Sequence, residues 1–329
     1  MPARVTAVQP TQAIEGGRIS IQGDRFSVDD PQLPSVRIGD RPARVVFASS
    51  SRFDVIVPEG LASGRAPVKI DGIAGETAFV EIAAPFASGL HQVDNPVFDH
   101  EGNLYVTFSG TRGQQVPVSI FRVTHAGTRE TFSSGIVNPT SMAIGPDGLL
   151  YVSSRFEGIV YRVAADGSAE PFATDLGVAC GLAFAPDGGL LVGDRSGTIF
   201  RVDRDGKSTT LASLPSSVAA FHLAMAPDGA LFVTGPTLGA YDAVYRILPG
   251  GLVNEHYVGF GRPQGLAFDP SGMLHVVEAL AGSSGVYRLT RDGRAELALS
   301  GPGLVGVAFD GLGTMVVCSN DTAYRLPRA

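Results

Sequence analysis

Six triplets of an aromatic residue, an arginine and an aliphatic residue recur along this chain: Phe121-Arg122-Val123, Tyr161-Arg162-Val163, Phe200-Arg201-Val202, Tyr245-Arg246-Ile247, Tyr287-Arg288-Leu289 and Tyr324-Arg325-Leu326. Each triplet follows a small-apolar strand, a turn with glycine, an apolar strand and a variable loop. The glycines of these first turns lie 40 to 46 residues apart, from Gly102 to Gly313. Four short strands at this interval are typical of one propeller blade. The repeat therefore predicts an all-β fold with a six-bladed β-propeller.

The two ends of the repeat predict how the ring closes. The sixth triplet is followed only by residues 327–329, so the sixth copy lacks a fourth strand. The segment Pro85–Leu90 has the same pattern as Pro171–Leu176, the fourth strand of the second copy. An open sheet edge needs a partner strand. We therefore expect Pro85–Leu90 to pair beside Tyr324-Arg325-Leu326, with the propeller occupying residues 84–329.

The repeated arginines have a structural and a functional interpretation. A ring of six arginines suggests an anion site, but a residue on the third strand of every blade lies far from the central channel. We expect packed aliphatic stems and paired guanidinium groups instead. The repeated Gly turns, several of them Pro-Asp-Gly, supply turn geometry.

The first 83 residues form a separate pattern of short strands. Apolar residues alternate in Arg18–Gln22, Ser35–Ile38, Ala43–Phe47, Phe53–Val57 and Ala66–Ile70, which favours a small immunoglobulin-like β-sandwich. The run Gly16-Gly17-x-Ile19-x-Ile21-x-Gly23-x-x-Phe26, with Val36-x-Ile38-Gly39 and Val55-x-Val57-Pro58, resembles the IPT/TIG family over residues 3 to 82. Members occur in extracellular receptors, polysaccharide-acting enzymes and DNA-binding factors, so the resemblance implies a fold and a spacer or docking role for residues 1–83.

Charge excludes two classes of partner. The formal net charge is −7 and the chain has only two lysines, Lys69 and Lys207. No basic stripe is available for nucleic acid or for an anionic membrane. No stretch approaches the length of a membrane-spanning helix, and the first residues lack the apolar run of a signal peptide. We expect a soluble protein, cytoplasmic as written and secreted or periplasmic if a signal was removed; nothing in the sequence indicates an oligomeric state.

One mouth of the propeller channel is the expected place for a ligand. The between-blade loops and the loops between second and third strands line this mouth, and they are the variable and polar ones. At the starts of the inner strands stand Asp94, Thr140, Cys180, Phe221, Gln264 and Val305. The opposite mouth carries the repeated Gly turns. The expected partner is a small-molecule or carbohydrate-like ligand.

The inner strands carry a second resemblance. Cys180-Gly181-Leu182-Ala183-Phe184 and Gln264-Gly265-Leu266-Ala267-Phe268, with Asp94-Asn95-Pro96-Val97-Phe98, resemble inner strands of the SMP-30/gluconolactonase/LRE and NHL-type propellers. In lactonases of that family a first-blade Glu, a fourth-blade Asn and a fifth-blade Asp hold a divalent cation, and a third-blade Asn contacts substrate. By position these become Asp94, Phe221 with His222 adjacent, Gln264 and Cys180. Only Asp94 keeps a hard anionic ligand.

The resemblance implies a set of site residues, each with an alternative. Asp94, His222 and Glu278 are the catalytic candidates, and Asp94, Gln264 and Glu278 are the candidate ligands of one divalent cation, Ca²⁺, Mg²⁺, Mn²⁺ or Zn²⁺. The substrate-binding candidates are Asn138, Cys180, Arg262 and Gln264. Alternatively, Asp94 belongs to a local Asp-Asn-Pro turn, His222 is satisfied by backbone, and Glu278 is solvated.

Two functions follow as expectations. The first is a lactonase- or esterase-type hydrolase, metal-assisted, acting at the channel mouth. The alternative is a non-catalytic binding module, or an extracellular scaffold, for a small molecule, glycan or peptide. Cys180 and Cys318 have no CxxC spacing and fall on opposite sides of a six-fold ring, so we expect two free thiols and no disulfide. If Asp94 is a ligand at the rim, Asp94→Ala leaves the melting temperature within a few degrees, whereas Tyr161→Ala is costly.

Overall fold

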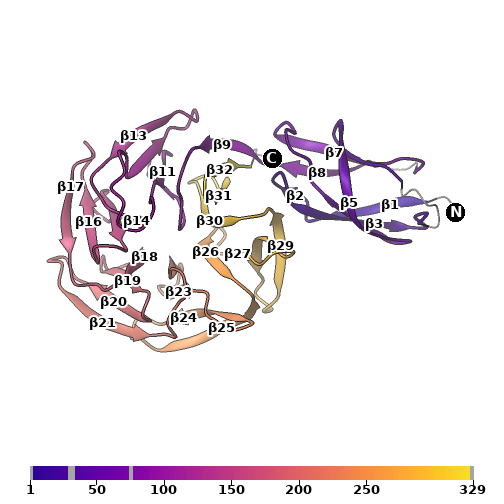
Figure 1. The fold of residues 1–329 in the computed structure, drawn as a ribbon. Helices are drawn as coiled ribbons and strands as arrows, with labels where there is room; N and C mark the ends of the chain where they lie inside the picture. Colours follow the sequence, from indigo (N-terminus) through magenta and orange to yellow (C-terminus); the bar gives the residue numbers. More distant parts are fainter. Residues whose placement is uncertain (1–2, 29–33, 74–76, 327–329) are drawn as a thin grey trace.

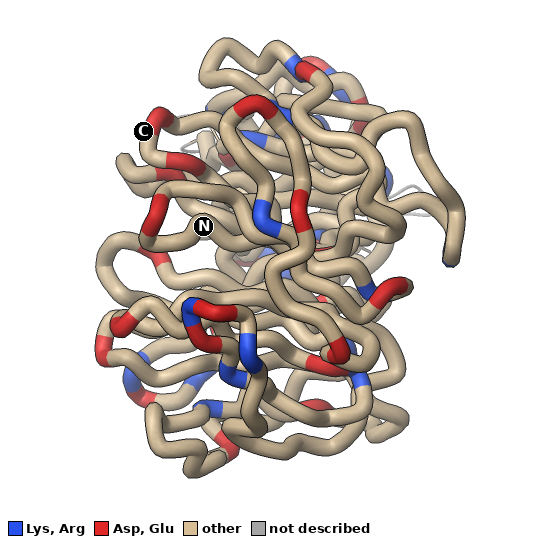
Figure 2. The backbone as a smooth tube through the Cα atoms, turned by 90° about the vertical axis from the view of Figure 1, so that its left-hand side faces the viewer, with Lys and Arg blue, Asp and Glu red and all other residues tan. Residues whose placement is uncertain are grey.

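The computed structural model describes residues 3–28, 34–73 and 77–326, and β-strands are its regular elements. A small group of strands at the N-terminal end leads into a ring of four-stranded sheets (Figure 1). No helix long and apolar enough to cross a membrane is found in the described residues. On the side of the ring shown in Figure 2, acidic and basic residues are interspersed, with no stripe of one sign.

The N-terminal strands form a mostly antiparallel β-fold around one apolar core. They run in the sheet order β1-β3-β6-β5-β4-β7-β8-β2. Their bounds are β1 (Arg4–Gln9), β2 (Gln12–Ala13), β3 (Arg18–Asp24), β4 (Val36–Ile38), β5 (Arg41–Ser49), β6 (Arg52–Ile56), β7 (Gly64–Ile70) and β8 (Ala78–Ile82). Alternation along β3 buries Ile19 and Ile21 against Phe53 and Val55, as the sequence pattern predicts.

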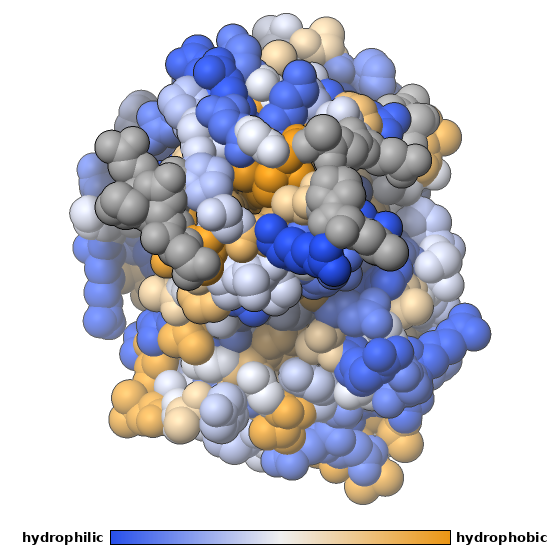
Figure 3. Space-filling view, turned by 90° about the vertical axis from the view of Figure 1, so that its right-hand side faces the viewer, coloured by the Kyte–Doolittle hydropathy of each residue, from blue (hydrophilic) through white to orange (hydrophobic). Residues whose placement is uncertain are grey.

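Polar residues of these strands are also organised. Asp54 is only 1% exposed, and its carboxylate pairs with Arg18 and Arg52 and accepts a hydrogen bond of 2.7 Å from the Ser20 hydroxyl. In Figure 3, which faces this end of the molecule, hydrophilic residues dominate among the atoms that are described. The fold is thus held by an apolar interior and one buried carboxylate that has several donors.

The ring consists of repeated antiparallel sheets of four strands. The first four blades are β10 (Val97–Phe98), β11 (Leu104–Thr107), β12 (Ile120–Val123) and β13 (Arg129–Ser133); β14 (Pro139–Ile144), β15 (Leu150–Ser154), β16 (Ile159–Val163) and β17 (Ala169–Ala173); β18 (Ala179–Phe184), β19 (Leu190–Asp194), β20 (Thr198–Val202) and β21 (Ser208–Ser213); and β22 (His222–Met225), β23 (Leu231–Thr234), β24 (Asp242–Ile247) and β25 (Val253–Phe260). Every aromatic-Arg-aliphatic triplet begins in the third strand of its copy. The inner strands contact one another in the order β10, β14, β18, β22, β26, β30 and back to β10, which closes the ring.

The last blade is completed by a strand from the other end of the ring. Its sheet order is β30 (Leu304–Phe309), β31 (Met315–Ser319), β32 (Thr322–Arg325) and β9 (Ala84–Ser88). β9 pairs antiparallel with β32, and Tyr324 lies opposite Pro85 (Figure 1). This is the pairing that the repeat of Pro85–Leu90 predicts. Covering the edge of β32 removes an exposed row of unpaired backbone groups.

The prediction of six separate blades needs a correction. Five four-stranded sheets stand by themselves, not six. The remaining copy, β26 (Pro263–Phe268), β27 (Leu274–Glu278), β28 (Gly285–Leu289) and β29 (Ala295–Ser300), is the end of a twelve-stranded sheet. The short strand β2 pairs in parallel with both β8 and β29, so this copy continues into the N-terminal strands. Nothing local in Gln12-Ala13 predicts that pairing, because it depends on residues nearly 290 positions away.

The N-terminal strands are also fastened to the ring beside β29. The backbone N–H of Ile14 donates to the Ser300 carbonyl at 3.0 Å, and the N–H of Arg18 donates to the Ser300 hydroxyl at 2.8 Å. The side chain of Ile14 is buried among Leu299, Leu304 and other ring residues. Hydrogen bonds and apolar burial together join the two parts of the chain.

The six repeated arginines have the structural role that the sequence predicts. Every one of them forms an ion pair with an acidic residue of its own copy. The pairs are Arg122–Glu130, Arg162–Glu170, Arg201–Asp187, Arg246–Asp228, Arg288–Glu296 and Arg325–Asp310. They do not form an anion-binding ring.

Candidate functional site

The segment Gln92–Asn95 makes contacts across the ring, and we call this set of contacts the closure. Asp94 lies just before β10, and His222 begins β22, three places away in the closed order of inner strands. The two residues therefore approach from opposite sides of the ring. Asp94 Oδ1 lies 2.5 Å from His222 Nδ1, with Asp94 1% exposed and His222 fully buried. The pair therefore joins two inner strands that lie opposite each other in the ring.

Asn95 extends this closure to two further inner strands. Its amide nitrogen donates to the Leu266 carbonyl at 2.8 Å, and its amide oxygen accepts from the Val307 N–H at 3.0 Å. The inner strands approach it so closely that side chains are excluded. A Cβ on Gly265 would lie 2.2 Å from Asn95 Oδ1, and one on Gly306 would lie 2.4 Å from the Asp94 carbonyl oxygen. Both glycines are required by this close contact.

A cavity of about 400 Å³ lies above this closure, and we call it the mouth cavity. Its wall on one side includes Arg112, Arg155 and Arg195. Its other walls are uncharged and include Gln92, Cys180, Val218, Gln264, Val305 and Asn320. Inner-strand starts and loops between second and third strands supply these residues, which places the cavity at the mouth where a ligand was expected. Its volume is in the range of small-molecule sites.

The three arginines of the mouth cavity were missed by the sequence reasoning. Arg155 directly follows β15 and Arg195 directly follows β19, at equivalent places in successive copies. Arg112 lies in the corresponding loop after β11. An arginine recurring at the end of the second strand is a signal that could have found them. Their guanidinium groups meet at one mouth because the ring places these loops side by side.

Asn138 was predicted to bind substrate, but it holds a loop instead. It is fully buried, with a positive φ of 48°, and is not among the residues that line the mouth cavity. Its amide nitrogen donates to the carbonyls of Ser109 at 2.6 Å and Thr111 at 2.8 Å, and its amide oxygen accepts from the Gly113 N–H at 2.6 Å. These bonds fix the loop that carries Arg112, so Asn138 acts on the cavity indirectly.

Glu278 also turns out to hold a loop. Its carboxylate accepts hydrogen bonds from three backbone N–H groups, those of Gly261, Arg262 and Leu280, at 2.6 to 2.9 Å. It is 3% exposed, which corrects the alternative that it is solvated. Arg262 is exposed and does not line the mouth cavity. The structure therefore does not bring Glu278 or Arg262 together with Asp94 and His222.

Cys180 and Gln264 do line the mouth cavity, as substrate-binding candidates should. The Cys180 thiol is 3.3 Å from the Val178 carbonyl, and burial raises the pKa of this thiol to about 12. A thiol with that pKa is protonated at neutral pH and is a poor nucleophile. Cys318 is fully buried, and both cysteines are free, as expected.

The residues fit a divalent cation poorly. No group of three or more His, Cys, Asp and Glu side chains that could hold a metal is found in the described part of the chain. Asp94 is engaged by His222, Glu278 by three amides, and the position of the family's fourth-blade ligand is the buried Phe221. Hard cations need several free oxygen donors directed at one point. The cation stays a prediction.

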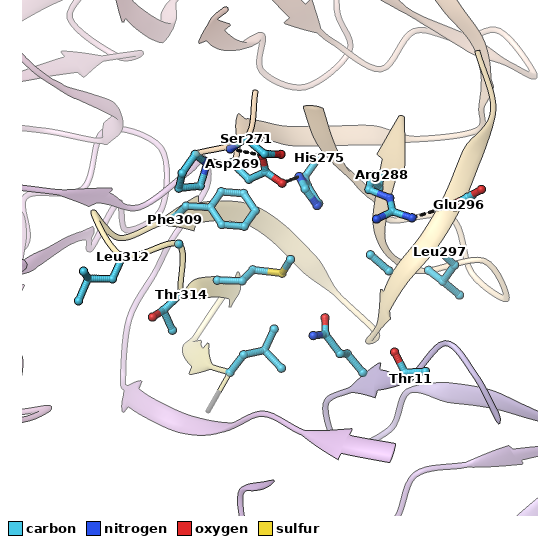
Figure 4. Close-up of a pocket in the computed structure, with 16 residues that line it drawn as sticks. Thr11, Asp269, Ser271, His275, Arg288, Glu296, Leu297, Phe309, Leu312 and Thr314 are labelled. Atoms are coloured by element: carbon cyan, nitrogen blue, oxygen red, sulfur yellow. Dashed lines mark hydrogen bonds and ion pairs between the residues drawn. The ribbon is translucent and has the colours of Figure 1, made fainter. Parts of the chain in front are cut away.

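A second and larger cavity, which we call the interface cavity, lies where the N-terminal strands meet the ring. It measures about 860 Å³, and Gln12, Asp269, His275, Arg288, Glu296 and Phe309 are among its lining residues (Figure 4). Its charged groups are paired within the protein. Arg288 contacts Glu296 at 2.7 Å, and Asp269 accepts hydrogen bonds from Ser271 and Met273 and lies 3.9 Å from the His275 ring. Sequence reasoning missed this cavity because it forms only between two parts of the chain.

Comparison with known proteins supports the architecture. Residues 3–80 match the family described as the IPT/TIG domain. The fold is similar to that of an auxiliary nutrient binding protein from Bacteroides ovatus, with 15% identity, a TM-score of 0.57, and coverage of 100% of this chain and 99% of the other. The chain thus carries a TIG domain and an all-β propeller.

Two further solved structures have a similar fold. A catalytically inactive virginiamycin B lyase from Staphylococcus aureus with quinupristin has 16% identity, a TM-score of 0.55, and coverage of 100% of this chain and 95% of the other. A presumed gluconolactonase has 18% identity, a TM-score of 0.61, and coverage of 74% and 91%. None of the curated proteins matches this sequence. At these identities the similarity shows the fold alone.

Proposed function

We propose that this protein binds a small organic molecule in the mouth cavity of its propeller. The observation that carries the proposal is a cavity of about 400 Å³ lined by both uncharged and cationic side chains. A concave site with a few directed polar groups is the usual form of a small-molecule site. One structural neighbour is named as a nutrient binding protein, and another contains quinupristin. We place the boundary between the docking module and the propeller at residues 83 and 84.

The proposal is tested by filling each cavity in turn. Small organic compounds, sugars included, are screened by the melting temperature of the wild-type protein. Val305→Trp fills part of the mouth cavity, whereas Leu312→Trp places the same bulk at the interface cavity. We expect compounds that stabilise the wild type to lose their effect on Val305→Trp and to keep it on Leu312→Trp. Hits that are insensitive to Val305→Trp would contradict the proposal.

A lactone or ester hydrolase is the second candidate, and the Asp94–His222 pair favours it. Asp94 Oδ1 lies 2.5 Å from His222 Nδ1, and His222 Nε2 has no hydrogen-bond partner among the described residues. A carboxylate that accepts from Nδ1–H leaves Nε2 able to take a proton. Nε2 would then accept the proton of a water that attacks the carbonyl carbon, and would return it to the alkoxide oxygen that leaves when the acyl C–O bond breaks.

The hydrolase is tested with nitrophenyl acetate and a simple lactone as substrates. His222→Gln removes the base, while His275→Gln replaces a buried histidine outside the mouth cavity as a matched control. The hydrolase predicts about a hundredfold loss of rate for His222→Gln and none for His275→Gln. Equal rates for all three proteins would exclude His222 as the base. Metal content, measured on protein purified without chelator, tests the cation separately.

A further inference from the structure

The cationic side chains of the mouth cavity lie on one half of the ring. Arg112, Arg155 and Arg195 follow the second strands of three successive blades, whose inner strands β10, β14 and β18 are neighbours. The lining residues from the other half of the ring, among them Val218, Ala220, Gln264 and Val305, carry no charge. The cavity therefore has a cationic side and a neutral side.

These three arginines have no acidic partner within the described residues. Each of the six arginines on the third strands forms an ion pair, but no ion pair includes Arg112, Arg155 or Arg195. Arg195 donates through Nε to the Ser217 carbonyl at 3.3 Å, which leaves its positive charge uncompensated. A guanidinium group presents several N–H donors suited to carboxylate, sulfonate or phosphate oxygens.

The nearby carboxylates form hydrogen bonds with groups other than these three arginines. Asp94 contacts His222, and Asp194 accepts a hydrogen bond of 2.8 Å from the Val178 N–H and another from the Ser196 hydroxyl. Arg155 is half-buried. The pKa of its guanidinium lies below the ordinary value, because burial removes it from water and because Arg112 and Arg195 add like charge. An anion in the cavity would relieve this repulsion.

The neutral side and the rim indicate the remaining chemistry of a ligand. Phe156 lines the cavity beside Arg155 and is 51% exposed, so a large aromatic ring lies open to solvent at the site. Val218, Ala219 and Val305 add apolar surface. Exposed aromatic and aliphatic groups around a cavity favour a ligand with an apolar portion.

We propose that the ligand of the mouth cavity is a small organic anion, with its acidic group against Arg112, Arg155 and Arg195 and its apolar part against Phe156 and the uncharged half of the ring. This inference rests on the proposed binding function and names its ligand class. The three arginines then act as a specificity determinant, selecting anionic over neutral compounds of the same shape.

A matched pair of fluorescent probes tests the inference. Anilinonaphthalene sulfonate carries an aromatic body and one negative charge, and phenylnaphthylamine has the same body without the charge. We expect the sulfonate to bind about tenfold more tightly than the neutral probe, with an affinity that falls as salt is raised. Arg155→Gln and Arg112→Gln should each weaken the sulfonate by about fivefold or more, with little effect on the neutral probe.

The controls separate the inference from the function on which it rests. Arg162→Gln removes an arginine that is paired with Glu170 outside the cavity and should leave both affinities unchanged. Arg112 is exposed, so its substitution keeps the test valid if Arg155→Gln fails to fold. Equal binding of both probes, blocked by Val305→Trp, would overturn the anion preference and leave the binding function standing. Binding of neither probe at the mouth, shown by insensitivity to Val305→Trp, would overturn both.

Discussion

The mouth cavity and the interface cavity differ in how their charges are satisfied. The interface cavity is about twice as large, yet its Arg288 is paired with Glu296 and its Asp269 accepts hydrogen bonds from Ser271 and Met273. In the mouth cavity, by contrast, none of the three arginines has an acidic partner among the described residues. An arginine that has no acidic partner in a concave site can pair with an anionic ligand, whereas an arginine already paired with a carboxylate has less to offer one. By volume alone, the interface cavity would be the better candidate for a ligand site. By its unpaired arginines, the mouth cavity is the better candidate.

The largest expected effect is the loss of stability when Asp94 is replaced. Asp94→Ala leaves buried His222 without its partner, and leaving a buried polar group without its hydrogen bond costs about 1 to 3 kcal/mol. This reverses the expectation from the sequence that Asp94→Ala leaves the melting temperature within a few degrees. Tyr161 is only partly buried, so Tyr161→Ala should cost less than Asp94→Ala. Urea unfolding of the three proteins measures the free energies.

Asp187→Ala is the control for that experiment, because it removes a carboxylate from the exposed pair with Arg201. It should cost about 0 to 1 kcal/mol. If Asp94→Ala is equally mild, the Asp94–His222 contact does not stabilise the ring. The interpretation of Asp94 as a free ligand at the rim would then regain its support.

Protonation of His275, which lines the interface cavity, should make the free energy of unfolding depend on pH. Burial lowers the pKa of His275 below its ordinary value of 6.5, although nearby Asp269 acts in the opposite direction. The unfolded chain therefore binds this proton more readily, so the contribution of His275 to stability is complete above pH 6.5 and declines as pH falls below it. His275→Gln should unfold with a weaker dependence on pH between about 7.5 and about 5.5 than the wild type. His91 and His256, whose pKa values are also lowered by burial, are present in both proteins.

The smallest expected changes in stability come from replacing one arginine that is paired with a carboxylate and one unpaired arginine that lines the mouth cavity. Arg201→Gln breaks the ion pair with Asp187 and should lower the free energy of unfolding by about 0 to 1 kcal/mol. Arg155→Gln breaks no ion pair and removes repulsion from Arg112 and Arg195, so we expect unchanged or slightly raised stability, most visibly at low salt. A loss for Arg155→Gln greater than that for Arg201→Gln would mean that Arg155 has a structural role.

The alternation and repeats of the sequence predicted which residues form strands and where those strands lie in each copy. The triplets lie in the third strands, and the strands expected between Arg18 and Ile70 correspond to β3 through β7. The likeness of Pro85–Leu90 to a fourth strand predicted the pairing of β9 with β32. Continuation of β29 into β2 could not be predicted, because no feature of Gln12-Ala13 distinguishes it from an ordinary short strand.

The site was predicted less well, for a physical reason. Position in the ring brought Cys180 and Gln264 to the mouth cavity and Asp94 into contact with His222, since inner strands converge on the channel. The sequence could not show that a side chain there is already hydrogen-bonded to neighbouring backbone groups, as those of Asn138 and Glu278 are. Nor could it show which arginines would lack a partner. Satisfaction of polar groups is a property of the folded chain.

The pairing of β9 with β32 has a consequence for synthesis of the protein. The ribosome makes residues 84–88 before almost all of the ring, and their partner residues 322–325 after it. Throughout that interval β9 has no hydrogen-bonding neighbour in its final sheet, and the Asp94–His222 contact cannot be secured by a closed ring. The last blade, and with it the closed ring of inner strands, is therefore completed only when β32 leaves the exit tunnel.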